Sequence, residues 1–133
     1  MKKIEHIGIA VKDLDTSNEL FASLFGKEHY KIEEVASEGV ITSFFKVGPN
    51  KIELLQATTL ESPIAKFIDK KGEGVHHIAF AVTDIVSEIE RLKSEGFIIL
   101  NEEPKKGADN KLVAFLHPKS TNGVLIELCQ EIE

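Results

Sequence analysis

The feature that most constrains the fold of this chain is an internal duplication. Residues 6–14 read HIGIAVKDL and residues 77–85 read HIAFAVTDI. Later in each half a second phrase recurs, as IELLQ at residues 52–56 and as IELCQ at residues 126–130. Two copies are too few for a solenoid, in which stacked neighbours bury each other's apolar faces. The duplication therefore predicts two similar modules that pack together as a single domain of 133 residues.

Both copies predict the same order of elements, β-α-β-β-β, so the predicted fold class is α+β with two tandem βαβββ modules. The first module, at about 1–57, is predicted to contain a strand at 4–11, a helix from Asp13 or Asp15 to Gly26, and strands at 28–36, 40–47 and 50–57. The second, at about 75–133, is predicted to contain a strand at 75–82, a helix at 84–95, and strands at 97–100, 111–117 and 123–130. A short helix at 62–70, with Pro63 in its first turn, is expected within the linker 58–74.

Strand alternation predicts where the repeated polar residues point. Successive side chains of a strand face opposite sides of the sheet, so the His of each first strand shares its face with small residues. These neighbours are Gly8 and Ala10 in one copy and Ala79 and Ala81 in the other. In each closing strand the Glu lies opposite the bulky Ile and Leu. A carboxylate in so apolar a strand needs water, a cation or a metal, because burying an unpaired charge costs several kcal/mol.

The four repeated polar residues predict the donor set of a divalent-metal site. The alternative is that they are ordinary half-exposed strand residues, yet both copies keep the same two residue types while most other side chains differ. Two imidazoles and two carboxylates suit Ni²⁺, Co²⁺, Mn²⁺ or Fe²⁺, and six-coordination leaves two positions for water or a bidentate substrate. Zn²⁺ is also compatible with the set. The predicted metal ligands are His6, Glu53, His77 and Glu127.

Composition narrows the partners and the compartment. The net charge is −6 and the lysines are scattered, so we expect neither a nucleic-acid partner nor a membrane partner. The single cysteine, Cys129, cannot form an internal disulfide, which is typical of a reducing compartment. We find no secretory signal pattern and no long apolar run, and we expect a cytoplasmic location. The turn at His117-Pro118-Lys119 is either a plain turn or a contact for an anionic substrate group.

With these motifs in place, the whole chain resembles the vicinal-oxygen-chelate superfamily. The segments SPIAKF (62–67), VHHIA (75–79), FLHPK (115–119) and GVLIEL (123–128) are most similar to the methylmalonyl-CoA epimerases. The resemblance implies sheets that curl round a metal site, a homodimer, and metal ligands at the four repeated positions. The His-Glu-His-Glu set itself resembles that of small bacterial glyoxalase I enzymes, which implies Ni²⁺ or Co²⁺.

Two positions depart from the epimerases. Some epimerases have Gln at the position of Glu53. At the position of Thr42, a member of the family has a carboxylate that serves as one of two opposed bases. A threonine hydroxyl cannot act as a general base at neutral pH. The resemblance implies a metal that chelates two oxygens of a CoA thioester or a thiol hemithioacetal while a carboxylate moves the proton. We expect Glu127 to be the principal base and Glu53 to return or relay the proton.

The expected function is methylmalonyl-CoA epimerase, with glyoxalase I (lactoylglutathione lyase) as the alternative that Glu53 and Thr42 favour. A third possibility is a protein of the same fold that binds a small ligand without catalysis, which would be expected to lose metal ligands. A fourth, an iron dioxygenase, needs only two His and one carboxylate, so a fourth ligand counts against it.

Overall fold

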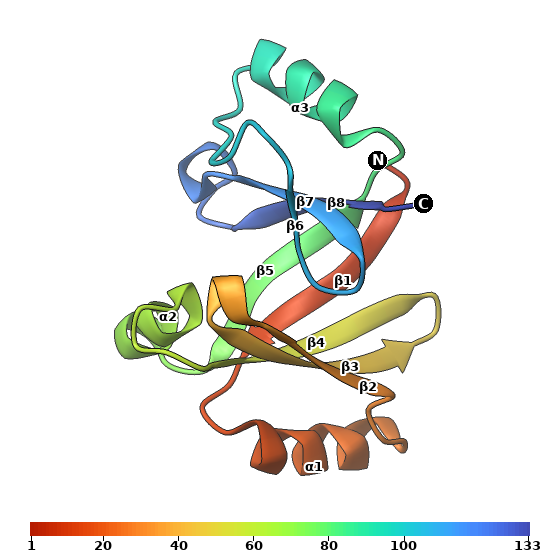
Figure 1. Ribbon diagram of the computed structural model, residues 1–133, viewed down its shortest axis with the longest axis vertical. Helices are drawn as coiled ribbons and strands as arrows, with labels where there is room; N and C mark the ends of the chain where they lie inside the picture. The colour runs from red at the N-terminus through yellow and green to blue at the C-terminus, as the bar shows by residue number, and fades with distance from the viewer. The chain divides into compact units, whose positions relative to one another are not determined.

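A computed structural model describes residues 1–133 (Figure 1). The chain forms two compact units. The N-terminal unit comprises His6–His76, and the C-terminal unit combines Met1–Glu5 with His77–Glu133. Each unit contains one β-α-β-β-β succession, which confirms the predicted fold class. No helix in the chain is both long enough and apolar enough to span a membrane.

In the N-terminal unit the strand order is β2-β3-β4-β1, with β1 parallel to β4 and the other pairs antiparallel. Its elements are β1 (Lys3–Ala10, which begins in the other unit), α1 (Leu14–Phe25), β2 (Lys31–Val35), the 3₁₀ turn Ala36–Glu38, β3 (Val40–Val47), β4 (Asn50–Ala57) and α2 (Pro63–Lys71). Helix α1 ends at Gly26, whose φ of 74° is the left-handed conformation that glycine adopts without strain.

Each face of this sheet has its own apolar cluster. One face packs against α1 through Val11, Leu14, Phe45 and Leu54. The other face packs against α2 through a cluster of Ala10, Val40, Leu55 and Ile64. Helix α2 therefore contacts this face near Ala10 and Leu55. His6 and Glu53 lie further along the same face.

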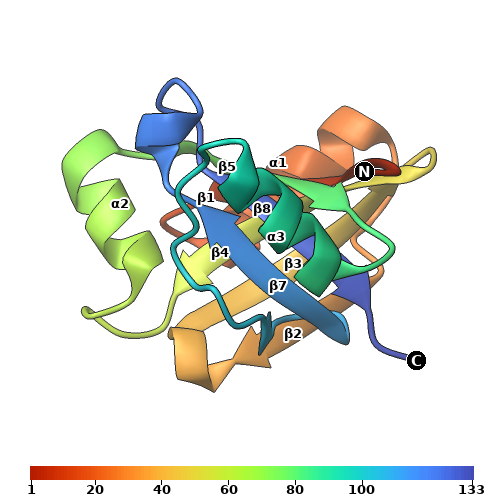
Figure 2. The same ribbon diagram turned by 90° about the horizontal axis from the view of Figure 1, so that it is seen from above.

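The C-terminal unit repeats the arrangement. Its strand order is β5-β8-β7-β6, and β5 runs parallel to β8 as β1 does to β4. Helix α3 lies across β7 and β8 (Figure 2), where Ile85, Ile89 and Leu92 pack on the apolar face of the sheet. The elements are β5 (Gly74–Ala81), α3 (Ile85–Ser94), β6 (Lys105–Lys106), β7 (Lys111–Leu116), the 3₁₀ turn Pro118–Ser120 and β8 (Ile126–Glu131).

The predicted elements agree with the observed ones except for one strand. Residues 97–100 form only an isolated bridge at Ile99, and the sixth strand is Lys105–Lys106. The side chain of Asn101 explains the displacement, because its Nδ2 donates to the Val113 carbonyl and its Oδ1 accepts from the Phe115 backbone N–H. At Asn101 the side-chain amide therefore forms the hydrogen bonds to β7 that a backbone would form in a strand, and the main chain leaves the sheet there.

The last residue of the repeated IELLQ/IELCQ phrase holds the helix of its own unit. The side-chain oxygen of Gln56 accepts from the backbone N–H of Leu14 at 2.6 Å, and that of Gln130 accepts from Ile85 at 2.7 Å. These N–H groups lie in the first turn of a helix, where no backbone partner exists. The repeated Gln therefore ties the closing strand to the helix start in both units.

Replacing this acceptor, Gln130→Leu, is expected to lower the free energy of unfolding by about 1–2 kcal/mol, because a partly buried N–H loses its partner. Urea denaturation measures the change, and an unaltered slope would show that only stability has changed. The matched variant Gln56→Leu is expected to behave alike. A midpoint equal to that of the unmodified protein would show that the amide contributes nothing.

Candidate functional site

The first predicted pair of ligands lies in the N-terminal unit, on the parallel strands β1 and β4. His6 Nδ1 is 3.1 Å from Glu53 Oε2, and the two side chains are 6% and 7% exposed. Their positions follow from the register, in which Gly8 is the direct partner of Glu53 and His6 lies one step earlier on the same face. Strand alternation and the β1–β4 register thus place the imidazole and the carboxylate on the same face of the sheet.

The second pair lies in the C-terminal unit and has the same construction. His77 Nε2 is 3.1 Å from Glu127 Oε1, with side chains 6% and 8% exposed. Ala79 is the direct partner of Glu127, so this His is again one step earlier on the same face. The two pairs differ in the nitrogen that faces the carboxylate, which is Nδ1 in His6 and Nε2 in His77.

An aromatic ring lies beside each carboxylate on the neighbouring antiparallel strand. Phe44 is the register partner of Glu53, and Phe115 is the register partner of Glu127. The Phe115 ring also meets the His77 ring edge-on, with centroids 6.1 Å apart. These rings exclude water from one side of each pair, which strengthens electrostatic interactions there.

The geometry of each pair fits a divalent metal ion. Two ligand atoms about 2.1 Å from an ion and at right angles to one another are about 3.0 Å apart. The observed nitrogen–oxygen separation is 3.1 Å in both pairs. Imidazole and carboxylate are ligands that Ni²⁺, Co²⁺, Mn²⁺, Fe²⁺ and Zn²⁺ accept. Each pair can therefore supply two adjacent ligands, or, without a metal, one hydrogen bond between ring and carboxylate.

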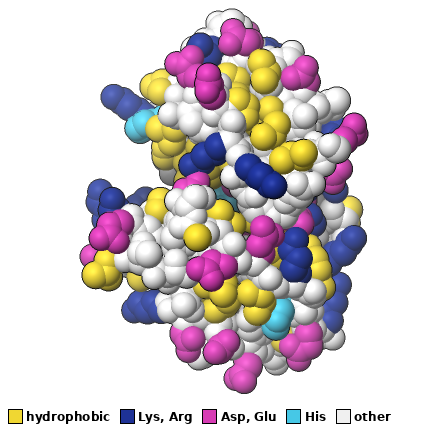
Figure 3. Space-filling model, in the orientation of Figure 1, with side chains coloured by type: hydrophobic (Ala, Val, Ile, Leu, Met, Phe, Trp, Pro, Cys, Tyr) yellow, Lys and Arg dark blue, Asp and Glu magenta, His cyan; other side chains and the backbone are white.

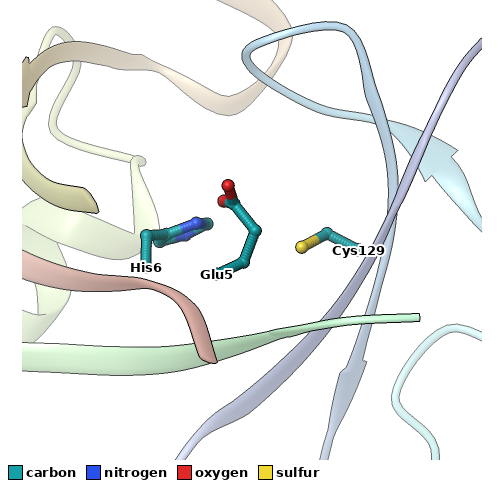
Figure 4. Close-up of side chains that lie close together, drawn as sticks. All are labelled: Glu5, His6 and Cys129. Atoms are coloured by element: carbon teal, nitrogen blue, oxygen red, sulfur yellow. The ribbon is translucent and has the colours of Figure 1, made fainter. Parts of the chain in front are cut away.

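A further buried carboxylate, that of Glu5, was missed by the sequence analysis. It belongs to the C-terminal unit and is 5% exposed, and a carboxylate oxygen lies within 4.8 Å of Cys129 Sγ. Figure 4 shows the Cys129 sulfur pointing toward the side chain of Glu5, with His6 as the next residue of the same strand. The available signal was an acidic residue inside an apolar strand. Cys129 Sγ is 3.6 Å from the Phe80 carbonyl oxygen, as expected for a packed thiol.

Thr42 occupies the position at which a related epimerase is expected to have a carboxylate. It is 1% exposed and is the register partner of Leu55, which places it on the same face as Glu53 and one step further along the sheet. The hydroxyl cannot act as a base at neutral pH. His117, by contrast, forms part of a turn, since its Nδ1 accepts from the Lys119 backbone N–H at 2.9 Å.

Charged side chains are spread over the surface. On the face drawn in Figure 3, Lys and Arg alternate with Asp and Glu. Some of them are paired, as in Lys93 Nζ to Glu102 Oε1 at 2.6 Å, which raises the pKa of Lys93. Glu88 contacts both Arg91 and the terminal amine, and its hydrogen bond with Arg91 lowers the pKa of its carboxyl group.

The comparison with known protein families agrees with the duplicated architecture. The model of the glyoxalase/bleomycin resistance protein/dioxygenase superfamily matches residues 5–115. The chain belongs to this superfamily. The predicted resemblance to the vicinal-oxygen-chelate proteins is therefore confirmed.

Similar proteins within this superfamily are epimerases. Ethylmalonyl-CoA/methylmalonyl-CoA epimerase of Cereibacter sphaeroides is 40% identical over 96% of this chain and 97% of its own length. The mitochondrial methylmalonyl-CoA epimerase of Dictyostelium discoideum is 40% identical over 95% of this chain and 76% of its own length. A solved methylmalonyl-CoA epimerase in complex with methylmalonyl-CoA and NH4+ superposes with a TM-score of 0.94 at 35% identity, covering 98% of this chain and 95% of the other. These relatives identify an enzyme of the isomerase class and favour the epimerase prediction over glyoxalase I.

Proposed function

We propose that this protein is a metal-dependent epimerase that acts on methylmalonyl-CoA. The proposal is carried by near-full-length similarity to methylmalonyl-CoA epimerases, together with a buried His–Glu pair at the same register position in each unit. Both modules act as one domain in this proposal.

The metal ligands in this proposal are His6, Glu53, His77 and Glu127. Ni²⁺ or Co²⁺ is the expected ion, and Mn²⁺, Fe²⁺ and Zn²⁺ are compatible with the donor set. When bound, a divalent ion supplies a Lewis acid that stabilises negative charge on the substrate oxygens. The 3.1 Å separation of nitrogen and oxygen within each pair supports this assignment.

The carboxylates carry the proton transfer. Glu127 removes the proton from the carbon next to the thioester carbonyl, so that the C–H bond breaks and its electron pair enters the enolate. A proton delivered to the opposite face of the same carbon then completes the inversion, and Glu53 returns or relays it. His6 and His77 orient the two carboxylates. Phe115, beside Glu127 and His77, keeps water from the carbanionic carbon.

A second candidate function is glyoxalase I, in which the proton moves to the neighbouring carbon of a thiol hemithioacetal. The observation that favours it is the carboxylate of Glu53, which makes a His-Glu-His-Glu donor set. A homodimer and a cytoplasmic location also belong to the proposal. The buried single thiol of Cys129 supports a reducing compartment.

An assay in D₂O tests the proposed function. The apo protein is loaded with Ni²⁺ or Co²⁺ and incubated with methylmalonyl-CoA and, separately, with glutathione and methylglyoxal. Inversion with deuterium incorporation at the α-carbon of the CoA ester is expected, and it should disappear when a chelator removes the metal. Lactoylglutathione formation alone would select the glyoxalase function. Absence of both reactions from the metal-loaded protein would rule out both candidates.

A further inference from the structure

Two lysines lie opposite each other near the turn of the β3–β4 hairpin. Lys46 and Lys51 are direct register partners. Direct partners in an antiparallel pair have their Cα atoms about 4.5–5.5 Å apart and their side chains on the same face of the sheet. Like charges in this arrangement repel each other and lower stability. An anion bound between the two ammonium groups would offset this repulsion.

The lysine pair lies beside the proposed metal ligands of the N-terminal unit. Lys51 is the register partner of His6 on β1, so their Cα atoms are about 4.8 Å apart. Glu53 follows Lys51 by two residues on β4, which places their side chains on the same face of the sheet. The lysines therefore occupy the row next to Glu53. In the proposed function they stand beside a bound cation, and positive charges gathered in this way attract anionic ligands.

The lysine pair is present in only one of the two units. The position of Lys51, two residues before the repeated glutamate, is occupied by Leu125 in the C-terminal unit. The position of Lys46 is occupied by His117, whose Nδ1 accepts a hydrogen bond within its own turn. The duplication thus repeats the His–Glu pair without the lysine pair. Positive charge on one unit alone suits an asymmetric ligand with a negative group at one end.

A third lysine on the same sheet face, Lys31, has a carboxylate of this chain beside it. Its Nζ lies 3.4 Å from Glu33 Oε1 and 4.7 Å from the centroid of the Phe44 ring. Lys46 is exposed, so that its ammonium group can turn toward a ligand, and Lys51 is half-buried. Partial burial strengthens the attraction between an ammonium group and an anion. Ligand binding is therefore assigned to Lys46 and Lys51.

Resting on the proposed function, we propose that Lys46 and Lys51 form a subsite that binds an oxyanion of the substrate. Ammonium groups donate charge-assisted hydrogen bonds to carboxylate and phosphate oxygens alike. Methylmalonyl-CoA carries both kinds of group, since its acyl part has a free carboxylate and its CoA part has phosphates. The subsite holds the substrate by one of these anions and takes no part in proton transfer.

The test compares Lys46→Gln and Lys51→Gln on two thioesters, methylmalonyl-CoA and methylmalonyl-pantetheine, which keeps the carboxylate but lacks the phosphates. In metal-loaded protein each substitution is expected to lower kcat/KM for methylmalonyl-CoA about tenfold, mainly through KM, because the contact forms on binding and persists in the transition state. The same loss with the truncated thioester assigns the carboxylate to the subsite, and an unchanged value assigns a phosphate.

The matched control is Lys27→Gln, which removes an exposed lysine just beyond α1, the helix that packs on the other face of the sheet. This variant should match the unmodified enzyme with both thioesters. The urea midpoints of Lys46→Gln and Lys51→Gln should not fall, because each substitution removes like-charge repulsion. Their kinetic loss should also shrink at high salt, which a structural defect would not do.

Anion binding can also be measured without turnover. Malonate and pyrophosphate, titrated calorimetrically into the metal-free protein, represent the carboxylate and the phosphates. The probe that matches the bound group should bind Lys46→Gln and Lys51→Gln about tenfold more weakly than it binds Lys27→Gln. Equal binding of both probes to all three variants would overturn the subsite, as would an unchanged kcat/KM for methylmalonyl-CoA in both lysine variants.

Failure of the proposed function gives a different result. The unmodified, metal-loaded protein would then be inactive on methylmalonyl-CoA, while a probe that depends on Lys46 and Lys51 would still show an anion subsite. Conversely, an active enzyme whose probe affinities do not depend on these lysines would keep the proposed function and lose the subsite.

Discussion

Replacing the proposed base, Glu127→Gln, is expected to lower the epimerisation rate by about 10³-fold or more. The amide has nearly the shape of the carboxylate. In the unmodified protein His77 Nε2 lies 3.1 Å from Glu127 Oε1, and the amide oxygen can accept a hydrogen bond from the same nitrogen. The packing against Phe115 is therefore retained. An amide cannot take up a proton at neutral pH and is a weaker metal ligand, so the variant loses proton transfer and part of its metal affinity together.

Deuterium exchange into methylmalonyl-CoA measures this loss at saturating metal, so that reduced affinity does not mask the chemistry. Glu133→Gln is the matched control, because Glu133 is exposed and lies just beyond the end of β8. This control is expected to remain within about twofold of the unmodified enzyme, as surface substitutions usually do. Full activity in Glu127→Gln would show that another group is the base.

The four repeated His and Glu positions could be singled out from the sequence because they depend only on alternation within a strand and on the duplication. His6 and Glu53 are far apart in the sequence, yet the parallel pairing of β1 and β4 brings them to 3.1 Å. The same pattern repeated at His77 and Glu127 made the prediction independent of any single residue. The bounds of most elements followed in the same way from periodicity, glycine and proline.

What the sequence could not reveal depends on pairing between strands. The neighbourhood of Thr42 and Glu33 follows from the β2–β3 register, which depends on how the two strands pair and not on the pattern within either strand alone. The displaced sixth strand follows from Asn101, whose amide replaces ladder bonds of β7. The role of the repeated Gln was equally hidden, since the N–H group that each one caps lies in a helix distant in the sequence.

The two units also differ at the end of the pair formed by their last two long strands, β3–β4 and β7–β8. In the N-terminal unit Val40 and Ala57 are register partners and pack beneath α2. In the C-terminal unit the equivalent partners are Lys111 and Glu131, and Lys111 Nζ lies 3.7 Å from Glu131 and 3.8 Å from Asp109. An apolar helix contact in one copy thus corresponds to a buried lysine with carboxylate neighbours in the other. The duplication preserved the His–Glu pairs while their surroundings diverged.

Removing one imidazole, His77→Ala, is expected to weaken binding of Ni²⁺ by at least about 100-fold, because even the loss of a group that only orients a ligand costs 10–100-fold. The matched control is His76→Ala. His76 neighbours His77 in β5 but meets the Phe67 ring of α2 edge-on, with centroids 5.0 Å apart. Its removal should lower stability slightly and leave the metal affinity unchanged.

Calorimetric titration with Ni²⁺ measures both affinities, and urea denaturation shows that each variant is folded. Added imidazole should restore Ni²⁺ binding to His77→Ala, because the substitution opens a space beside Glu127 in which a free ring can take the place of the lost one. A purely structural histidine would not be replaced in this way. Equal loss of affinity in both variants would mean that alternation along β5 does not decide which histidine binds the metal, and the ligand assignment would then be wrong.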